Sequence, residues 1–409
     1  MKINFGLISA DSHAQLHRDA FTQRMSKTRF GARIPHVEES SDPAWRAFTW
    51  DERPVERWVV DGRVVDTRGV ANCPALMGNI DRMFMPQRWE DTPPAAYDPI
   101  ARLNVLDEDG VDGEVLFCNN PAFGSCFIQC DAELELACVQ AYNDAIWEWR
   151  EASERYVPLM IIPYFSGIEA TVREVTRCAR KGFRGLIMLA EPSSVGDDKF
   201  FKKDAPVNPA FRHCLKHFCD PYWEPLWAVC QELGIAIHWH ADGGLKTPLS
   251  IWKRYTAYEL FAVSSPAAHS SLAQFLPNAV FAGVFERYPR LNWVCAETTL
   301  GWFNYVLDSC DQVWERRQLW KHGIKTRPSE QIRERVYADF WFEKASEGLD
   351  VRYRLGAGHI MWQSDLPHGT STYPDSRKIL NRALEGVPED EVPLLLYKNA
   401  MKLYGLEES

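Results

Sequence analysis

The segment INFGLISADSH, residues 3–13, joins an apolar run to two side chains of the kind that bind metals. The run 3–10 is expected to form a buried strand, and Asp11, Ser12 and His13 follow it. Residues two apart on a strand project to the same side, so Asp11 and His13 can reach a common point. Carboxylate and imidazole groups are the usual ligands of divalent metal ions. The segment therefore predicts a first strand whose end carries a pair of metal ligands.

Short apolar runs that end in polar or small residues recur along the chain and are separated by segments with helical periodicity. Strands that alternate with helices form a largely parallel sheet, and eight of them predict a (β/α)8 TIM barrel of the α/β class. A doubly wound open sheet is the alternative, which is disfavoured because no glycine-rich phosphate loop follows the first run. The eight runs are 3–10, 111–117, 157–163, 183–190, 234–239, 291–296, 336–342 and 359–362, and the expected helices include 134–150, 168–181 and 225–233.

Two long insertions elaborate the expected barrel, which we take to be a single domain over residues 1–409. They are residues 14–100 after the first strand and residues 241–285 after the fifth. Loops that follow strand ends build the active-site face of such barrels, so both insertions are expected over that face. Their aromatic residues could form a substrate lid or a subunit contact, or an extra packed layer with no chemical role.

Charge and composition exclude several classes of function. The formal net charge is −10, and such an acidic chain should repel nucleic acids and anionic membranes. No window offers the ~20 apolar residues of a membrane helix, and the N-terminal residues do not read as a signal peptide. Eleven cysteines, an odd number, favour reduced thiols and a cytoplasmic protein.

His213 and His217 have the spacing of a metal pair, but without a third ligand nearby they are interpreted as surface residues.

Several strand ends bring ligand-type side chains to the same face of the expected barrel. The fifth run ends at His240, the sixth at Glu297 and the eighth leads to Asp365. Two histidines, His238 and His368, lie close to these in sequence, although His238 could equally be a buried core histidine. Imidazoles and carboxylates that converge on one cleft predict a divalent metal site.

The chain also resembles the amidohydrolase-related family (amidohydrolase family 2), which contains the aminocarboxymuconate-semialdehyde and resorcylate decarboxylases. The resemblance extends from residue 3 to residue 406 and is weakest in the two insertions. It rests on ISADSH at 8–13, DPIARLNVLDEDGVDGEVLF at 98–117, EPLWAVCQELGIAIHWH at 224–240, ERYPRLNWVCAETTLGWFNYVLDSCDQVW at 286–314, KTRPSEQIRERVYADFWFE at 325–343, IMWQSDLPHGTSTYPDSRKIL at 360–380 and NAMKLYGL at 399–406.

This resemblance implies roles for individual residues. Asp11, His13, His240 and Asp365 match the family's metal ligands, and Asp365 also matches its proton-transfer group. Glu297 occupies the sixth-strand position, where many members carry histidine, and is expected to be catalytic. Where one branch of the family has a glutamate three residues after the first-strand histidine, this chain has Leu16, followed by His17. The substrate is expected to contact a further set, His368, His238, Trp302 and His17. The alternatives are that Trp302 packs in the core, that His17 is a surface histidine and that His368 holds its loop.

The resemblance implies a metal-dependent hydrolase or carboxy-lyase. The cofactor expected is one divalent metal, with zinc favoured, manganese or iron as alternatives, and two metals as a further option. The reaction expected is decarboxylation or hydrolysis of a small carboxylated substrate, aromatic or cyclic. A dinuclear iron or manganese monooxygenase that activates oxygen is the alternative from another reaction class, and a non-catalytic partner subunit is a third. By analogy with the family, the chain is expected to form a homodimer.

Overall fold

The structure is a computed structural model, and the residues that it describes form two compact units. The first unit comprises Met1–Glu174, Ser364–Arg377 and Glu408–Ser409, and the second comprises Val175–Gln363 and Lys378–Glu407. The single-domain organisation expected from the sequence stays a prediction. The described residues are 1–46, 49, 52–78, 85–122, 127, 130–194, 215–241 and 254–408.

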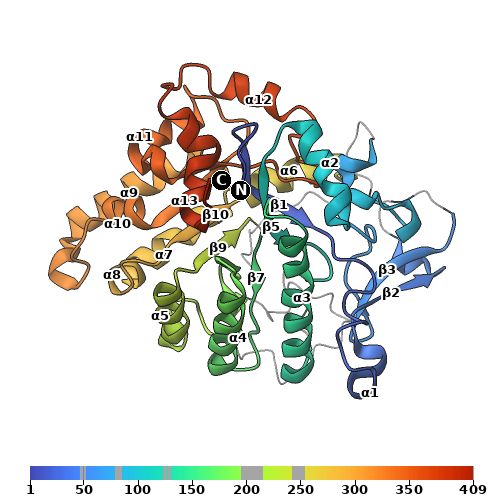
Figure 1. The fold of residues 1–409 in the computed structure, drawn as a ribbon. Helices are drawn as coiled ribbons and strands as arrows, with labels where there is room; N and C mark the ends of the chain where they lie inside the picture. The colour runs from blue at the N-terminus through green and yellow to red at the C-terminus, as the bar shows by residue number, and fades with distance from the viewer. Residues whose placement is uncertain are drawn as a thin grey trace. The chain divides into compact units, whose positions relative to one another are not determined.

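The first unit contains a parallel sheet in the order β1 (Ile8–Ala14), β5 (Gly113–Cys118) and β6 (Tyr156–Pro158). β1 and β5 lie side by side (Figure 1), and every residue of both strands is buried. The register of β1 against β5 shifts between Ser9 and Ser12, which adds one residue to β1. Such a bulge re-aims the side chains beside it.

The first strand begins later than the sequence predicted. It was expected over 3–10, but the chain preceding Ile8 binds a side chain instead of a neighbouring strand. The carboxylate of Asp112 accepts hydrogen bonds from the backbone N–H groups of Asn4 at 2.7 Å and Leu7 at 3.1 Å. β1 also ends later than predicted, at Ala14, so Asp11 and His13 lie within the strand and do not follow it.

Two helices of the first unit, α2 and α3, begin at aspartate caps. The side chain of Asp98 accepts from the first N–H groups of α2 (Pro99–Asp109), and Asp131 does so for α3 (Ala132–Ala152). An acceptor at this position satisfies N–H groups that have no partner within the helix. α3 confirms the helix predicted over 134–150.

The insertion 14–100 contains a small antiparallel sheet that the sequence analysis missed. Its strands are β2 (His36–Ser40), β3 (Val55–Val60) and β4 (Arg63–Val64), with the short helix α1 (Lys27–Phe30) before them. β3 is buried along its whole length, so it lacks the alternation that marks a half-exposed strand. The buried guanidinium of Arg57 donates to the carbonyls of Glu56 and Gln87, which lie in this insertion.

The run predicted over 157–163 is divided between β6 and a second short strand, β7 (Met160–Ile161). The side chain of Asn143 donates to the carbonyl of Ile161 at 3.0 Å and accepts from its N–H at 2.9 Å. α4 (Ile168–Lys181) follows over the predicted range, with residues in both units.

The second unit contains five parallel strands in the order β12-β11-β10-β9-β8. Trp239 and Trp293 stack in its core with ring centroids 4.3 Å apart. Each of the last five predicted runs overlaps one of these strands, so the prediction of parallel pairing is confirmed there. The strands are β8 (Gly185–Ile187), β9 (Ala236–His240), β10 (Trp293–Ala296), β11 (Val336–Phe340) and β12 (Ile360–Trp362).

Helices accompany these strands, and α9 and α10 lie side by side (Figure 1). No helix among the described residues is long and apolar enough to cross a membrane. The helices are α5 (Glu224–Leu233), α6 (Ala257–His269), α7 (Leu276–Phe281), α8 (Val284–Arg287), α9 (Gly301–Arg317), α10 (Pro328–Arg335), α11 (Arg352–Leu355), α12 (Ser376–Ala383), which begins in the first unit, and α13 (Asn399–Tyr404).

Candidate metal centre

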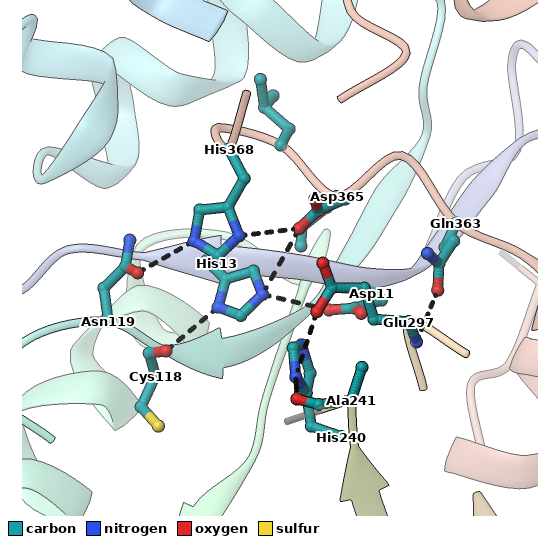
Figure 2. Close-up of polar contacts among 12 residues, drawn as sticks. Asp11, His13, Cys118, Asn119, His240, Ala241, Glu297, Gln363, Asp365 and His368 are labelled. Atoms are coloured by element: carbon teal, nitrogen blue, oxygen red, sulfur yellow. Dashed lines mark hydrogen bonds and ion pairs between the residues drawn. The ribbon is translucent and has the colours of Figure 1, made fainter. Parts of the chain in front are cut away.

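In the first unit, the buried carboxylates of Asp11 and Asp365 both lie close to one ring nitrogen of the buried His13. Its Nε2 lies 3.5 Å from Oδ1 of Asp11 and 3.5 Å from Oδ1 of Asp365 (Figure 2). All three side chains are fully buried. β1 supplies Asp11 and His13, as the period-2 pattern predicted.

The hydrogen bond at the other ring nitrogen fixes the tautomer of His13. Nδ1 lies 3.0 Å from the carbonyl oxygen of Cys118, which can only accept, so Nδ1 carries the hydrogen. A neutral His13 ring therefore presents the lone pair of Nε2 to the two carboxylates. A distance of 3.5 Å is long for a hydrogen bond. Two ligand atoms that share a tetrahedral ion at about 2.1 Å lie roughly 3.4 Å apart, so the spacing fits a shared cation.

The backbone holds Asp365 beside β1. The N–H of Asp365 donates to the carbonyl of Asp11 at 2.9 Å, and the N–H of His13 donates to the carbonyl of Leu366 at 2.7 Å. Asp365 itself has a φ of 55°, a strained conformation for a residue with a side chain. Its Oδ2 accepts a hydrogen bond from the hydroxyl of Thr370. The aspartate is therefore held in place by both its backbone and its side chain.

His368 extends this group on the side away from Asp11. Its Nδ1 lies 2.9 Å from Oδ1 of Asp365, and its ring stacks on that of His13 with centroids 3.8 Å apart. His13, Asp365 and His368 form a group of three buried side chains whose donor atoms lie within 4.8 Å of one another, close enough to hold a metal ion.

Asn119 orients the ring of His368. Its amide nitrogen donates to the carbonyl of Asn72 at 3.3 Å, so its Oδ1 faces Nε2 of His368 at 3.0 Å and accepts from it. With the hydrogen on Nε2 committed to Asn119, Nδ1 is the ring nitrogen that faces the Asp365 carboxylate. Asn119 was missed in the sequence analysis, because its role depends on His368, 249 residues away.

A buried arginine ties the backbone of this group together. Arg102 donates to the carbonyls of His13 at 3.3 Å and Leu366 at 2.9 Å. It also forms a two-pronged ion pair with Glu114, at 3.0 and 3.1 Å, and both side chains are fully buried. Pairing compensates for much of the cost of removing these charges from water.

A second group of carboxylate and imidazole side chains lies in the second unit. His240 ends β9, and its Nδ1 lies 2.9 Å from the carbonyl of Ala241 and 3.3 Å from Oε2 of Glu297 (Figure 2). Glu297 follows β10 with a φ of 55°. His269, at the end of α6, brings its Nε2 to 4.0 Å from Oε1 of Glu297. His269 lies inside the insertion 241–285 and was missed, because no pattern in the sequence links it to Glu297.

The other predicted substrate residues have different surroundings. His238 is fully buried, with Nδ1 3.1 Å from the carbonyl of Leu186 and Nε2 2.8 Å from the hydroxyl of Tyr404. Burial lowers the pKa of His238 to about 3, so its ring is neutral at pH 7. These contacts are those of a core histidine, which was the alternative for this residue, and its substrate role stays a prediction.

The substrate-binding roles predicted for Trp302 and His17 also stay predictions. The indole N–H of Trp302 donates to the carbonyl of Thr298 at 2.8 Å, next to Glu297 in sequence. The side chain of His17 is half exposed. Leu16 is buried and apolar, so it cannot supply the ligand that a glutamate would supply there. His213 lies outside the described residues, and His217 is exposed and paired with Glu191 at 2.9 Å.

Comparisons with known proteins give the chain a consistent set of relatives. The amidohydrolase family model matches residues 131–406. No curated protein matches the sequence. An amidohydrolase from Mycobacterium avium subsp. paratuberculosis K-10 is 20% identical, with a TM-score of 0.71 over 98% of this chain and 100% of that one.

Two further solved structures are those of decarboxylases. The 5-carboxyvanillate decarboxylase of Sphingomonas paucimobilis is 16% identical, with a TM-score of 0.62 over 99% of this chain and 100% of that one. The dihydroxybenzoic acid decarboxylase of Polaromonas sp. JS666, solved with manganese and the inhibitor 2-nitroresorcinol, is 18% identical, with a TM-score of 0.58 over 78% and 90%. These likenesses confirm the predicted α/β fold of amidohydrolase type. The strand pairings described above lie within each unit, so closure into a barrel rests on the likeness.

Proposed function

Because the chain belongs to the amidohydrolase family of enzymes, we propose that it is a metal-dependent decarboxylase of an aromatic carboxylic acid that carries a neighbouring hydroxyl group. The observation that carries the proposal is that the buried carboxylates of Asp11 and Asp365 each lie 3.5 Å from Nε2 of the buried His13. The decarboxylase activities of the Sphingomonas and Polaromonas proteins support decarboxylation over hydrolysis.

The donor set of the first unit fits a divalent ion. Two carboxylates supply charge, and the lone pair of His13 Nε2 is fixed by the bond from Nδ1 to the carbonyl of Cys118. We assign Asp11, His13, His240 and Asp365 as the ligands of one ion, with His240 included on its family position. Zinc was predicted from the sequence, and the manganese of the Polaromonas protein makes manganese the other metal to test. When bound, the ion supplies Lewis-acid attraction for the carboxylate and hydroxyl oxygens of the substrate.

Asp365 is the proposed proton donor. It would give its proton to the ring carbon that bears the carboxylate and form a new C–H bond. The bond from this carbon to the carboxylate then breaks, its electron pair returns to the ring, and carbon dioxide leaves. His368, with Nδ1 at 2.9 Å from Asp365 Oδ1, is placed to return a proton to the aspartate. Glu297 was also predicted to be catalytic, and we keep that role as part of the proposal. Its carboxylate lies 3.3 Å from Nδ1 of His240, within the second unit.

A second candidate function is oxygen activation by two iron or manganese ions. Glu297 favours it, because its two carboxylate oxygens lie near different histidines, His240 at 3.3 Å and His269 at 4.0 Å. A carboxylate placed in this way can belong to a second ion.

Metal analysis and turnover test the proposal together. Purified protein would be analysed for bound metals and assayed for carbon dioxide release from 2,6-dihydroxybenzoate and 5-carboxyvanillate. We expect one equivalent of zinc or manganese, its loss in His13→Gln, and its retention in the control His322→Gln, which changes an exposed histidine. Two equivalents of iron with oxygen consumption would favour the second candidate, and a folded protein that binds no metal would refute both.

We also propose that the chain forms a homodimer. Light scattering on the same sample would test the homodimer expected from the family resemblance, and a monomer would contradict it.

A further inference from the structure

We propose that Gln363 is a substrate-binding residue whose side-chain amide donates a hydrogen bond to the carboxylate of the aromatic acid. This inference rests on the proposed decarboxylase function and adds a residue to it. Gln363 follows β12 directly and is fully buried. The carboxyl ends of parallel strands are where ligands bind in folds of this class.

Two hydrogen bonds fix how Gln363 lies. Its backbone N–H donates to the carbonyl of Phe340 at 3.0 Å, which continues the pairing of β12 with β11. Its side-chain Oε1 accepts from the backbone N–H of Glu297 at 3.1 Å (Figure 2). The opposite amide orientation would set an NH2 group against an N–H, two donors face to face, so Oε1 must be the atom that faces Glu297.

This orientation leaves the amide nitrogen as a buried donor. Nε2 of Gln363 has no hydrogen-bond acceptor among the residues that the structure describes. Buried polar groups are nearly always hydrogen-bonded, and a donor left without an acceptor destabilises the fold. A glutamine held in this way, when an apolar side chain would avoid the cost, is explained if a ligand supplies the acceptor.

The surroundings of Gln363 within the second unit indicate which ligand this is. Its Oε1 partner is the backbone of Glu297, the residue whose carboxylate lies 3.3 Å from His240. The donor therefore belongs to the same group of side chains as two residues of the proposed reaction. An N–H donor binds an anionic oxygen more strongly than a neutral one. Among the groups of a hydroxylated aromatic acid, the carboxylate is therefore the preferred acceptor.

Two substitutions separate substrate binding from a purely structural role. Gln363→Glu keeps an oxygen that accepts from the N–H of Glu297 but replaces the donor with a second acceptor. Gln363→Met removes both functions at similar size. If Gln363 only supports the Glu297 loop, Gln363→Glu should behave like the natural protein and Gln363→Met should not. If it binds the substrate carboxylate, both should bind the acid weakly.

The measurements are KM and kcat for 2,6-dihydroxybenzoate and 5-carboxyvanillate, Kd for 2-nitroresorcinol, and metal content. We expect KM to rise roughly tenfold to hundredfold in both variants, as for a lost bond to a charged group, with metal content unchanged. Binding of 2-nitroresorcinol, whose nitro group stands in for a carboxylate, should weaken in parallel. Gln331→Glu is the matched control: Gln331 is also buried, but its amide nitrogen donates to the carbonyl of Thr326 at 2.8 Å, and KM should be unchanged.

The outcomes distinguish this inference from the function on which it rests. Natural protein that turns over an acid, together with a Gln363→Glu variant of unchanged KM and Kd, would overturn the role of Gln363 and leave the decarboxylase standing. Natural protein that neither binds nor decarboxylates these acids would overturn both.

Discussion

His368 and Asp365 form a buried pair in which Nδ1 of the histidine lies 2.9 Å from Oδ1 of the aspartate. The far side of the ring is held by Asn119, whose Oδ1 lies 3.0 Å from Nε2. Asn119 thereby determines that the nitrogen facing the aspartate is Nδ1. The amide of Asn119 is thus connected to the proposed proton donor through one imidazole ring.

Replacing Asn119 with alanine should therefore slow catalysis without removing the metal. We expect kcat to fall about 10–100-fold, the usual effect of losing a partner that orients a site residue, with little change in KM. Asn120→Ala is the control, since its side chain bonds Asp66 at 3.1 Å instead. Steady-state kinetics and metal analysis check the prediction. Equal loss of metal and activity would instead mean that Asn119 supports the metal site as a whole.

Asp365→Asn should abolish most turnover, because the amide cannot deliver the proton. We expect kcat to fall about 10²–10⁴-fold when the variant is assayed with saturating manganese or zinc, which compensates for a weakened ligand. Asp375→Asn, an exposed aspartate in the same segment, should leave kcat unchanged. A metal-loaded Asp365→Asn enzyme with normal kcat would remove Asp365 from the proton-transfer role.

The fold was predictable because its signal is local. Each of the eight apolar runs overlaps an observed strand, since burial on both faces of a parallel strand requires a continuous apolar run. The errors are where a distant side chain decides the outcome. Residues 3–7 are apolar enough for a strand, but Asp112 binds their N–H groups. The sheet of β2, β3 and β4 was missed because its central strand, although fully buried, contains two charged residues, Glu56 and Arg57, that interrupt the apolar run.

The candidate site was predictable in part for the same reason. Asp11 and His13 share a strand, and their two-residue spacing is visible in the sequence. The sequence does not single out three further residues, because their partners are distant in sequence and only the fold brings them close: Asn119, His269 and Gln363. A glutamine after a strand gives no sign that its oxygen will meet the N–H of Glu297, 66 residues away.

Breaking the ion pair of Arg102 and Glu114 should strongly destabilise the first unit. Arg102→Met leaves the Glu114 carboxylate buried without its partner, which typically costs ~3–5 kcal/mol. It also removes the donors to the carbonyls of His13 and Leu366. The double variant Arg102→Met/Glu114→Met should recover part of the loss, because no buried charge remains. Urea unfolding of the three proteins measures this. A single variant as stable as the natural protein would show that the pair contributes nothing to stability.

His238 should make the second unit less stable as the pH falls below neutral. Its folded-state pKa of about 3 lies below the ordinary value of 6.5, because burial disfavours the charged ring. Above pH 6.5 the ring is neutral in both folded and unfolded states and has no effect. Below pH 6.5 the unfolded chain binds a proton that the folded chain excludes, so stability falls by about 1.4 kcal/mol per pH unit until the pH approaches 3.

The non-titrating variant His238→Asn should remove this dependence. Between pH 6.5 and pH 5 the natural protein should lose about 2 kcal/mol more unfolding free energy than the variant. The variant is expected to be less stable at pH 7, because it loses the bond to Tyr404, so the comparison is of slopes rather than absolute values. His322→Gln, at an exposed histidine, should keep the slope of the natural protein. Parallel curves for the natural protein and His238→Asn would mean that His238 is protonated in the folded state as readily as in the unfolded one.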